Sequence, residues 1–102
     1  NNAAWILATS PDPNTRNPSE AIRIAQELGS ETNYKNSAAL DTLGAAYASA
    51  GRFAEAIEMT QKALSLTDQN DKYMLDQIQS HLDLYKVSKP YIETWQENKS
   101  AK

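Results

Sequence analysis

The chain has one histidine, His81, the side chain best suited to transferring protons near neutral pH. It lies on a segment in which Leu75, Ile78 and Leu82 recur at helical spacing. Proton transfer or nucleophilic attack would need a second group to orient this imidazole. The sequence has no cysteine and no second histidine, and no acid stands at a spacing that would serve. We therefore expect His81 to be a surface or interface residue and the chain not to be an enzyme.

Two acidic stretches superficially resemble calcium loops. The first begins at Asp68, but Lys72 stands where an oxygen ligand is needed. The second begins at Asp12 and fails in the same way, because Arg16 falls at a ligand position. The three glycines are isolated, so they form no phosphate-binding loop, and a thiolate zinc site would need cysteine. The sequence therefore predicts no metal and no cofactor.

The composition limits the kinds of partner that we expect the chain to bind. A chain of 102 residues is one domain, and 10 basic against 13 acidic residues give a net charge of −3. That balance argues against a surface that neutralises phosphates, so we expect no nucleic acid partner. No apolar run is long enough to span a bilayer, so we expect no membrane partner. The absence of cysteine leaves the compartment open. Because the chain begins with Asn1 rather than Met, we expect it to be a fragment of a longer protein.

Helix signals come in pairs along the chain. Residues 17–20 combine a capping asparagine, a proline at the first helical position and a glutamate, and they open a helix that we expect to close at Gly29. Further helices are expected over 37–50 and 53–66. The last expected helix follows the apolar spacing of 75–85 until a proline ends the run. No segment shows strand alternation, so the fold class predicted is all-α.

The sequence also matches itself when it is shifted by 35 residues. The shift places Glu-Ala-Ile at 20–22 on the same three residues at 55–57. It also places Trp5 on Leu40, and Leu40 on Leu75. An internal repeat of this length is typical of stacked helical hairpins. The plan predicted is two hairpins followed by a fifth helix.

Within 37–66, the spacing of apolar and small residues resembles the tetratricopeptide repeat family. The matching residues are Leu40, Leu43, Gly44, Tyr47, Ala56 and Ala63. The resemblance covers roughly residues 3–92, and the stretch from AWILATSPD to RNPSEAI looks like a variant repeat of bacterial members. Leu40, Thr60 and Asp68 depart from the usual tryptophan, aromatic residue and proline. The resemblance implies that Gly44 packs closely against the helix that carries Ala56.

The resemblance also implies a division of the chain. Residues 1–92 would form one α–α superhelix, with a degenerate repeat at 1–36, a well-matched repeat at 37–70 and a capping helix at 71–92. Residues 93–102 would be a polar tail. An ordinary helical bundle remains the alternative, because alanine, leucine and tyrosine at helical spacing would serve it as well.

In an arrayed fold of this kind the first helix of each hairpin lines a concave face, and that face binds a peptide or a partner domain. Small residues would leave space there, Tyr73 would supply an aromatic contact, and the acidic residues favour a neutral or basic partner. We expect Asp41 and Asp76 to be solvent-facing, so that lysine at both positions removes binding without loss of stability. The expected partner-binding residues are Asp41, Thr42, Ala45, Tyr73, Asp76, Gln77 and Ser80.

A structural role is the alternative function. Trp5, Ile6 and Leu7 are consecutive large apolar residues on a short helix. Part of that surface is expected to face a missing upstream repeat or a second copy of the chain. In this alternative the chain is a spacer or an oligomerisation segment of a larger protein, to which an enzyme domain could be attached outside this fragment.

Overall fold

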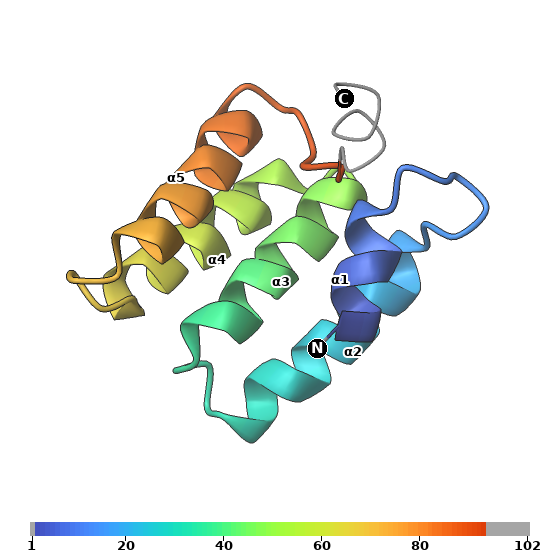
Figure 1. The fold of residues 1–102 in the computed structure, drawn as a ribbon. Coiled ribbons are helices and arrows are strands. Elements are labelled where there is room, and N and C mark those ends of the chain that lie inside the picture. Colours follow the sequence, from blue (N-terminus) through green and yellow to red (C-terminus); the bar gives the residue numbers. More distant parts are fainter. Residues whose placement is uncertain (1, 94–102) are drawn as a thin grey trace, which may run out of the picture.

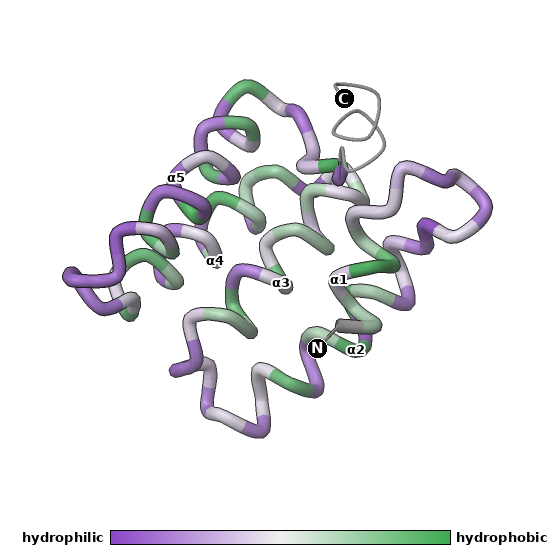
Figure 2. The backbone as a smooth tube through the Cα atoms, in the orientation of Figure 1, coloured by the Kyte–Doolittle hydropathy of each residue, from purple (hydrophilic) through white to green (hydrophobic). Residues whose placement is uncertain are grey.

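The computed structural model describes residues 2–93, which form five helices and no strand (Figure 1). The predicted all-α class is confirmed for this part of the chain. The helices are α1 (Asn2–Thr9), α2 (Pro18–Glu31), α3 (Ser37–Ser49), α4 (Phe53–Leu66) and α5 (Lys72–Lys86). Hydrophilic residues gather in the connections, for example between α4 and α5 (Figure 2). None of the described helices is both long and apolar enough to cross a membrane.

Side-chain caps begin three of the helices. Asn17, Asn36 and Asp71 each accept a hydrogen bond from the backbone N–H three residues further on, at the starts of α2, α3 and α5. Such a cap satisfies one of the backbone donors that the first turn leaves free, and it is worth about 1 kcal/mol. These local signals explain why α2, α3 and α5 begin where the sequence predicts.

The end of α2 differs from the prediction. The helix runs past Gly29 and stops at Glu31, and the chain reverses through Asn33 and Tyr34, both at positive φ. Gly29 is buried because the Tyr34 ring folds back over it, and a Cβ at this position would lie 2.7 Å from the ring. The glycine is therefore needed for a close contact rather than for ending the helix.

Helix α3 is the centre of the fold and contacts each of the other four helices. Every residue from 39 to 48 is buried. Its small side chains let the neighbouring helices approach, most of all at Gly44. A Cβ on Gly44 would overlap Thr60 Oγ1 and lie 3.3 Å from the backbone oxygen of Ala56. The predicted packing of Gly44 against the helix that carries Ala56 is confirmed.

The helices form two rows. Helices α1, α3 and α5 lie side by side, and α3, in the middle, contacts both α1 and α5 (Figure 1). Helices α2 and α4 lie behind them and complete the hairpins α1–α2 and α3–α4. The second hairpin turns at Gly51, whose φ of 82° lies in the left-handed region that favours glycine. The row of α1, α3 and α5, which we call the inner row, is the one that borders the face on which a groove is expected.

After α5 the chain turns back toward α1 in a non-helical stretch, residues 87–93, which we call the return segment. The Glu93 N–H donates to Thr9 O over 2.8 Å, and the Trp5 indole N–H donates to Glu93 Oε2 over 2.9 Å. The sequence instead assigns helix up to residue 92 and places Glu93 in a tail. The rest of that tail, residues 94–102, lies outside the described residues.

Candidate functional site

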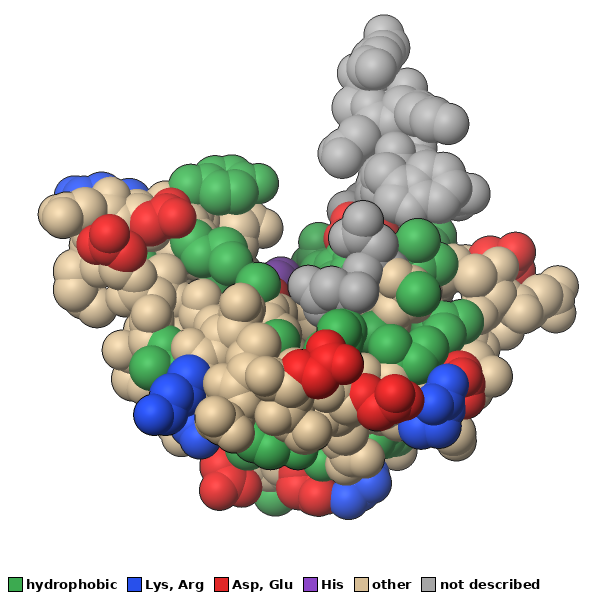
Figure 3. Space-filling model, turned by 90° about the horizontal axis from the view of Figure 1, so that it is seen from below, with side chains coloured by type: hydrophobic (Ala, Val, Ile, Leu, Met, Phe, Trp, Pro, Cys, Tyr) green, Lys and Arg blue, Asp and Glu red, His purple; other side chains and the backbone are tan. Residues whose placement is uncertain are grey.

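A pocket of about 260 Å³ opens between α1, α3, α5 and the return segment. The space-filling view shows the hollow in this face of the molecule (Figure 3). Trp5, Tyr91 and Glu93 contribute from α1 and the return segment. The two central walls come from α3 and α5, through Ala38, Asp41, Thr42, Met74, Gln77 and His81.

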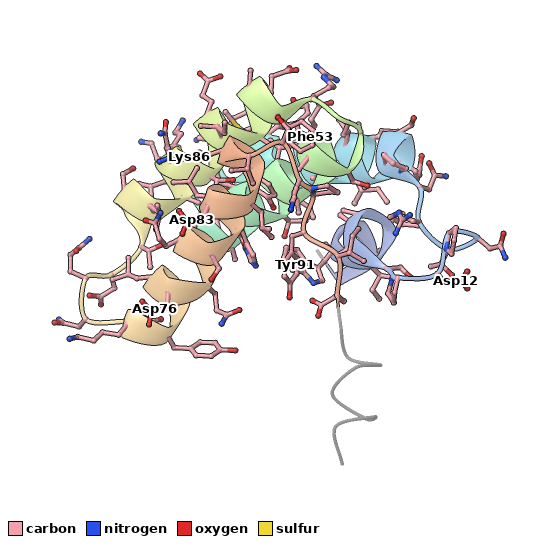
Figure 4. The ribbon with its side chains drawn as sticks, turned by 90° about the horizontal axis from the view of Figure 1, so that it is seen from above. Asp12, Phe53, Asp76, Asp83, Lys86 and Tyr91 are labelled. Atoms are coloured by element: carbon pink, nitrogen blue, oxygen red, sulfur yellow. The ribbon has the colours of Figure 1, made fainter. Side chains whose placement is uncertain are left out.

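Three of the residues expected to bind a partner line this pocket: Asp41, Thr42 and Gln77. Ala45 does not, because it is buried under α1 beside Ala8. The other three lie exposed on α5 outside the pocket wall; they are Tyr73, Asp76 and Ser80. Figure 4 shows Asp76 on this helix. The structure thus brings together part of the expected set.

Asp41 and His81 form a buried pair between α3 and α5. His81 Nδ1 lies 3.0 Å from Asp41 Oδ1, and the two residues are only 3% and 8% exposed, His81 being the less exposed. The expectation that Asp41 faces solvent is therefore wrong. Because an ionised carboxylate can only accept a hydrogen bond, Nδ1 carries the proton. His81 does lie at a helix interface, and an acid does orient it, but that acid is 40 residues away in sequence.

Two aromatic rings pack beside this pair. The His81 ring centroid lies 4.4 Å from that of Tyr91 and 5.6 Å from that of Trp5. Tyr91 comes from the return segment (Figure 4), and burial, then the nearby Glu93 carboxylate, raises the pKa of its phenol. Trp5 is thus covered in part by the chain itself, whereas Ile6 remains 52% exposed. Self-association through Trp5, Ile6 and Leu7 stays a prediction.

The Tyr85 side chain is buried near Asp41, and its hydroxyl has no hydrogen-bond partner among the described residues. Burial raises the pKa of this phenol well above its usual value, and the negative charge of Asp41 adds to the effect. A buried hydroxyl without a partner costs about 1–3 kcal/mol. Tyr85 is therefore a position where the fold carries an uncompensated polar group.

Replacing Tyr85 by phenylalanine is expected to maintain or increase the free energy of unfolding at neutral pH, by up to about 1–3 kcal/mol. A phenol whose folded pKa is raised contributes stability that is fully present below its unfolded pKa of about 10 and is lost as the pH rises above that value. The wild-type protein should therefore lose more stability than Tyr85→Phe in alkaline solution. Urea unfolding across this pH range measures both effects. Tyr73→Phe, at an exposed position, is the control. If Tyr85→Phe lowered the free energy of unfolding at neutral pH by more than about 1 kcal/mol, the Tyr85 hydroxyl would have to be hydrogen-bonded.

The Asp41–His81 pair and Thr42 are the groups of the pocket wall to consider for chemistry. An Asp–His pair can orient a base, but the threonine hydroxyl of the wall, Thr42 Oγ1, donates back to Ala38 O over 3.0 Å. In the part of the chain that the structure describes, no three acidic, histidine or cysteine side chains are grouped to hold a metal ion. What remains is a concave surface with three aromatic rings and two carboxylates, those of Asp41 and Glu93.

No protein-family model, no curated protein and no solved structure matches this chain. Its likeness to the tetratricopeptide repeat therefore rests on the spacing of its own residues and on the arrangement of its helices.

Proposed function

We propose that the chain is a non-catalytic protein-interaction module built as a short tetratricopeptide-type superhelix. In such a fold the first helices of successive hairpins contact one another and border a concave face. Helix α3 contacts α1 and α5, and within the two hairpins α1 contacts α2 and α3 contacts α4. The proposal needs these contacts. The ordinary bundle is less favoured, because the 35-residue self-match coincides with this two-row arrangement.

The hollow between α1, α3 and α5 receives an extended segment of a partner protein. The single observation that carries this proposal is the position of the pocket, which lies on the inner row and is lined by all three of its helices. Asp41 and Glu93 line it, and within residues 2–93 no lysine or arginine does, which favours a neutral or basic segment over an acidic one. For so short an array we expect micromolar affinity at best, about −8 kcal/mol.

Selection of short random peptides on the immobilised protein, followed by fluorescence anisotropy, tests this function. Gln77→Trp fills the hollow from an exposed position, and Gln79→Trp adds the same ring two residues further on, about 200° around α5. We expect Gln77→Trp to weaken peptide binding at least about tenfold and Gln79→Trp to leave it unchanged. Equal binding by all three proteins would contradict the groove.

A structural role is the second candidate. A mostly apolar pocket of about 380 Å³ lies at the α1 end, where Ile6 is exposed beside Trp5 and Thr9. In this case the surface on α1 joins two copies of the chain or packs against a neighbouring domain. A sedimentation measurement that finds a dimer, abolished by Ile6→Glu but not by Gln77→Trp, would favour this candidate.

A further inference from the structure

We propose that the pocket beside Asp41 takes the side chain of an arginine. The proposal rests on the proposed function for the source of that arginine, which is a segment of the partner protein. The pocket itself can be tested with arginine alone.

Among the described residues, the lining of the pocket carries two acidic groups and no lysine or arginine. Asp41 and Glu93 are both in the wall, and no lysine or arginine of the described chain shares it. Arg23 and Arg52 form ion pairs with glutamates on the exposed surfaces of α2 and α4. A cationic guest would therefore meet a negative site that the described residues leave uncompensated.

Asp41 is the central group of this site. Its side chain is about nine-tenths buried, with 11% exposed, and its Oδ1 atom is bonded to His81. A carboxylate can accept about four hydrogen bonds. The Oδ2 atom accepts none from the described residues, and Asp41 is one of the residues that line the pocket. A buried carboxylate with one donor gains from a second, charged one.

The shape of the pocket favours arginine over other cations. Trp5, His81 and Tyr91 pack against one another with centroids 4.4–5.7 Å apart, so no guest fits between the rings. A flat guanidinium can lie on the outer face of this cluster while its donors reach Asp41. The compact ammonium of lysine has no flat face to stack on the rings and makes no bidentate contact with a carboxylate. A volume of about 260 Å³ is below that of sites for whole ligands, and fits one inserted side chain.

Nuclear magnetic resonance titration of the full chain with N-acetyl-arginine amide tests the pocket directly. The signal of the Trp5 indole N–H, assigned with Trp5→Phe, should shift in a saturable manner. The same amide of citrulline, which has the shape of arginine without its charge, should bind at least about tenfold more weakly. The lysine amide should also bind more weakly than arginine.

Gln77 offers matched variants at an exposed position in the wall, where folding is not at stake. Gln77→Glu adds a carboxylate and should strengthen arginine binding about threefold or more, while Gln77→Lys should weaken it about tenfold. Gln79→Glu and Gln79→Lys make the same charge changes outside the pocket and should have little effect. Similar effects at both positions would mean general attraction by the surface and would overturn the proposal.

The outcomes separate this proposal from the function on which it rests. One outcome is that the selected peptides bind in the hollow, contain no arginine, and have the same affinity for Gln77→Glu as for the wild type. This outcome would support the interaction module and overturn the arginine pocket. A second outcome is that the arginine amide binds in a saturable manner, the citrulline amide does not bind, and the selection yields no peptide. This outcome would support the pocket and contradict the peptide groove. Equal binding of arginine and citrulline amides, or binding of neither, would overturn the pocket.

Discussion

Replacing Gly44 by leucine is expected to lower the free energy of unfolding by about 3 kcal/mol or more. At this position even a Cβ overlaps Thr60 Oγ1, which could rotate away, and lies 3.3 Å from the backbone oxygen of Ala56, which cannot. The whole leucine side chain would force α3 and α4 apart along the most extensive helix contact of the fold. For a domain of this size the midpoint of thermal unfolding should fall by about 12 °C or more.

Ala54→Leu is the matched control, since it adds a similar group to the exposed face of α4 and should change stability by about 0.5 kcal/mol or less. Gly44→Ala should fall between the two, and adding Thr60→Ala should recover part of its loss because Thr60 is the nearest obstacle. Thermal unfolding followed by circular dichroism measures the four variants and the wild type. A midpoint for Gly44→Leu equal to that of the wild type would refute the close packing of α3 on α4.

The second large effect is expected at Asp41. Lysine at this position would bury an unpaired cation facing His81 and should cost about 3–5 kcal/mol. Alanine removes only the acceptor of the histidine N–H and should cost about 1–3 kcal/mol. The exposed Asp76, which sequence reasoning treats as equivalent, should accept lysine at about 0.5 kcal/mol or less. Urea unfolding of the three variants measures these differences.

A double-mutant cycle isolates the pair itself. If the Asp41–His81 contact is stabilising, Asp41→Ala combined with His81→Ala should cost less than the sum of the single changes, by about 0.5–3 kcal/mol. Asp76→Ala with His81→Ala provides the additive control, because within the described residues the imidazole pairs with Asp41 and not with Asp76. Strict additivity in both cycles would show that the pair contributes no interaction energy.

The parts of the fold that the sequence predicts are those with local causes. The cap predicted at Asn17 is present at the start of α2, and the small residue at Gly44 marks a close helix contact. The end of α2 could not be read in this way. Gly29 is a common helix stop, but here the ring of Tyr34 covers it and the helix continues.

The site is predicted less completely, because helical periodicity gives the direction of a side chain but not its depth. Asp41 and Ala45 are one turn apart on the inner face of α3, and both are buried by neighbouring helices. Tyr73 is on α5 near its first residue and stays 76% exposed. The pairing of Asp41 with His81 depends on how α5 packs on α3, and no local spacing carries that information.

The return segment also bears on how cooperatively the chain folds. In a stack of helical repeats each unit touches only its neighbours, so the ends can open separately from the middle. Here Glu93 bonds to Trp5 across 88 residues of sequence, and its backbone bonds to Thr9. These contacts raise the mean sequence separation of the native contacts, and they require the first helix and the end of α5 to be in place together. We therefore expect the two ends of the described chain to gain and lose their order together.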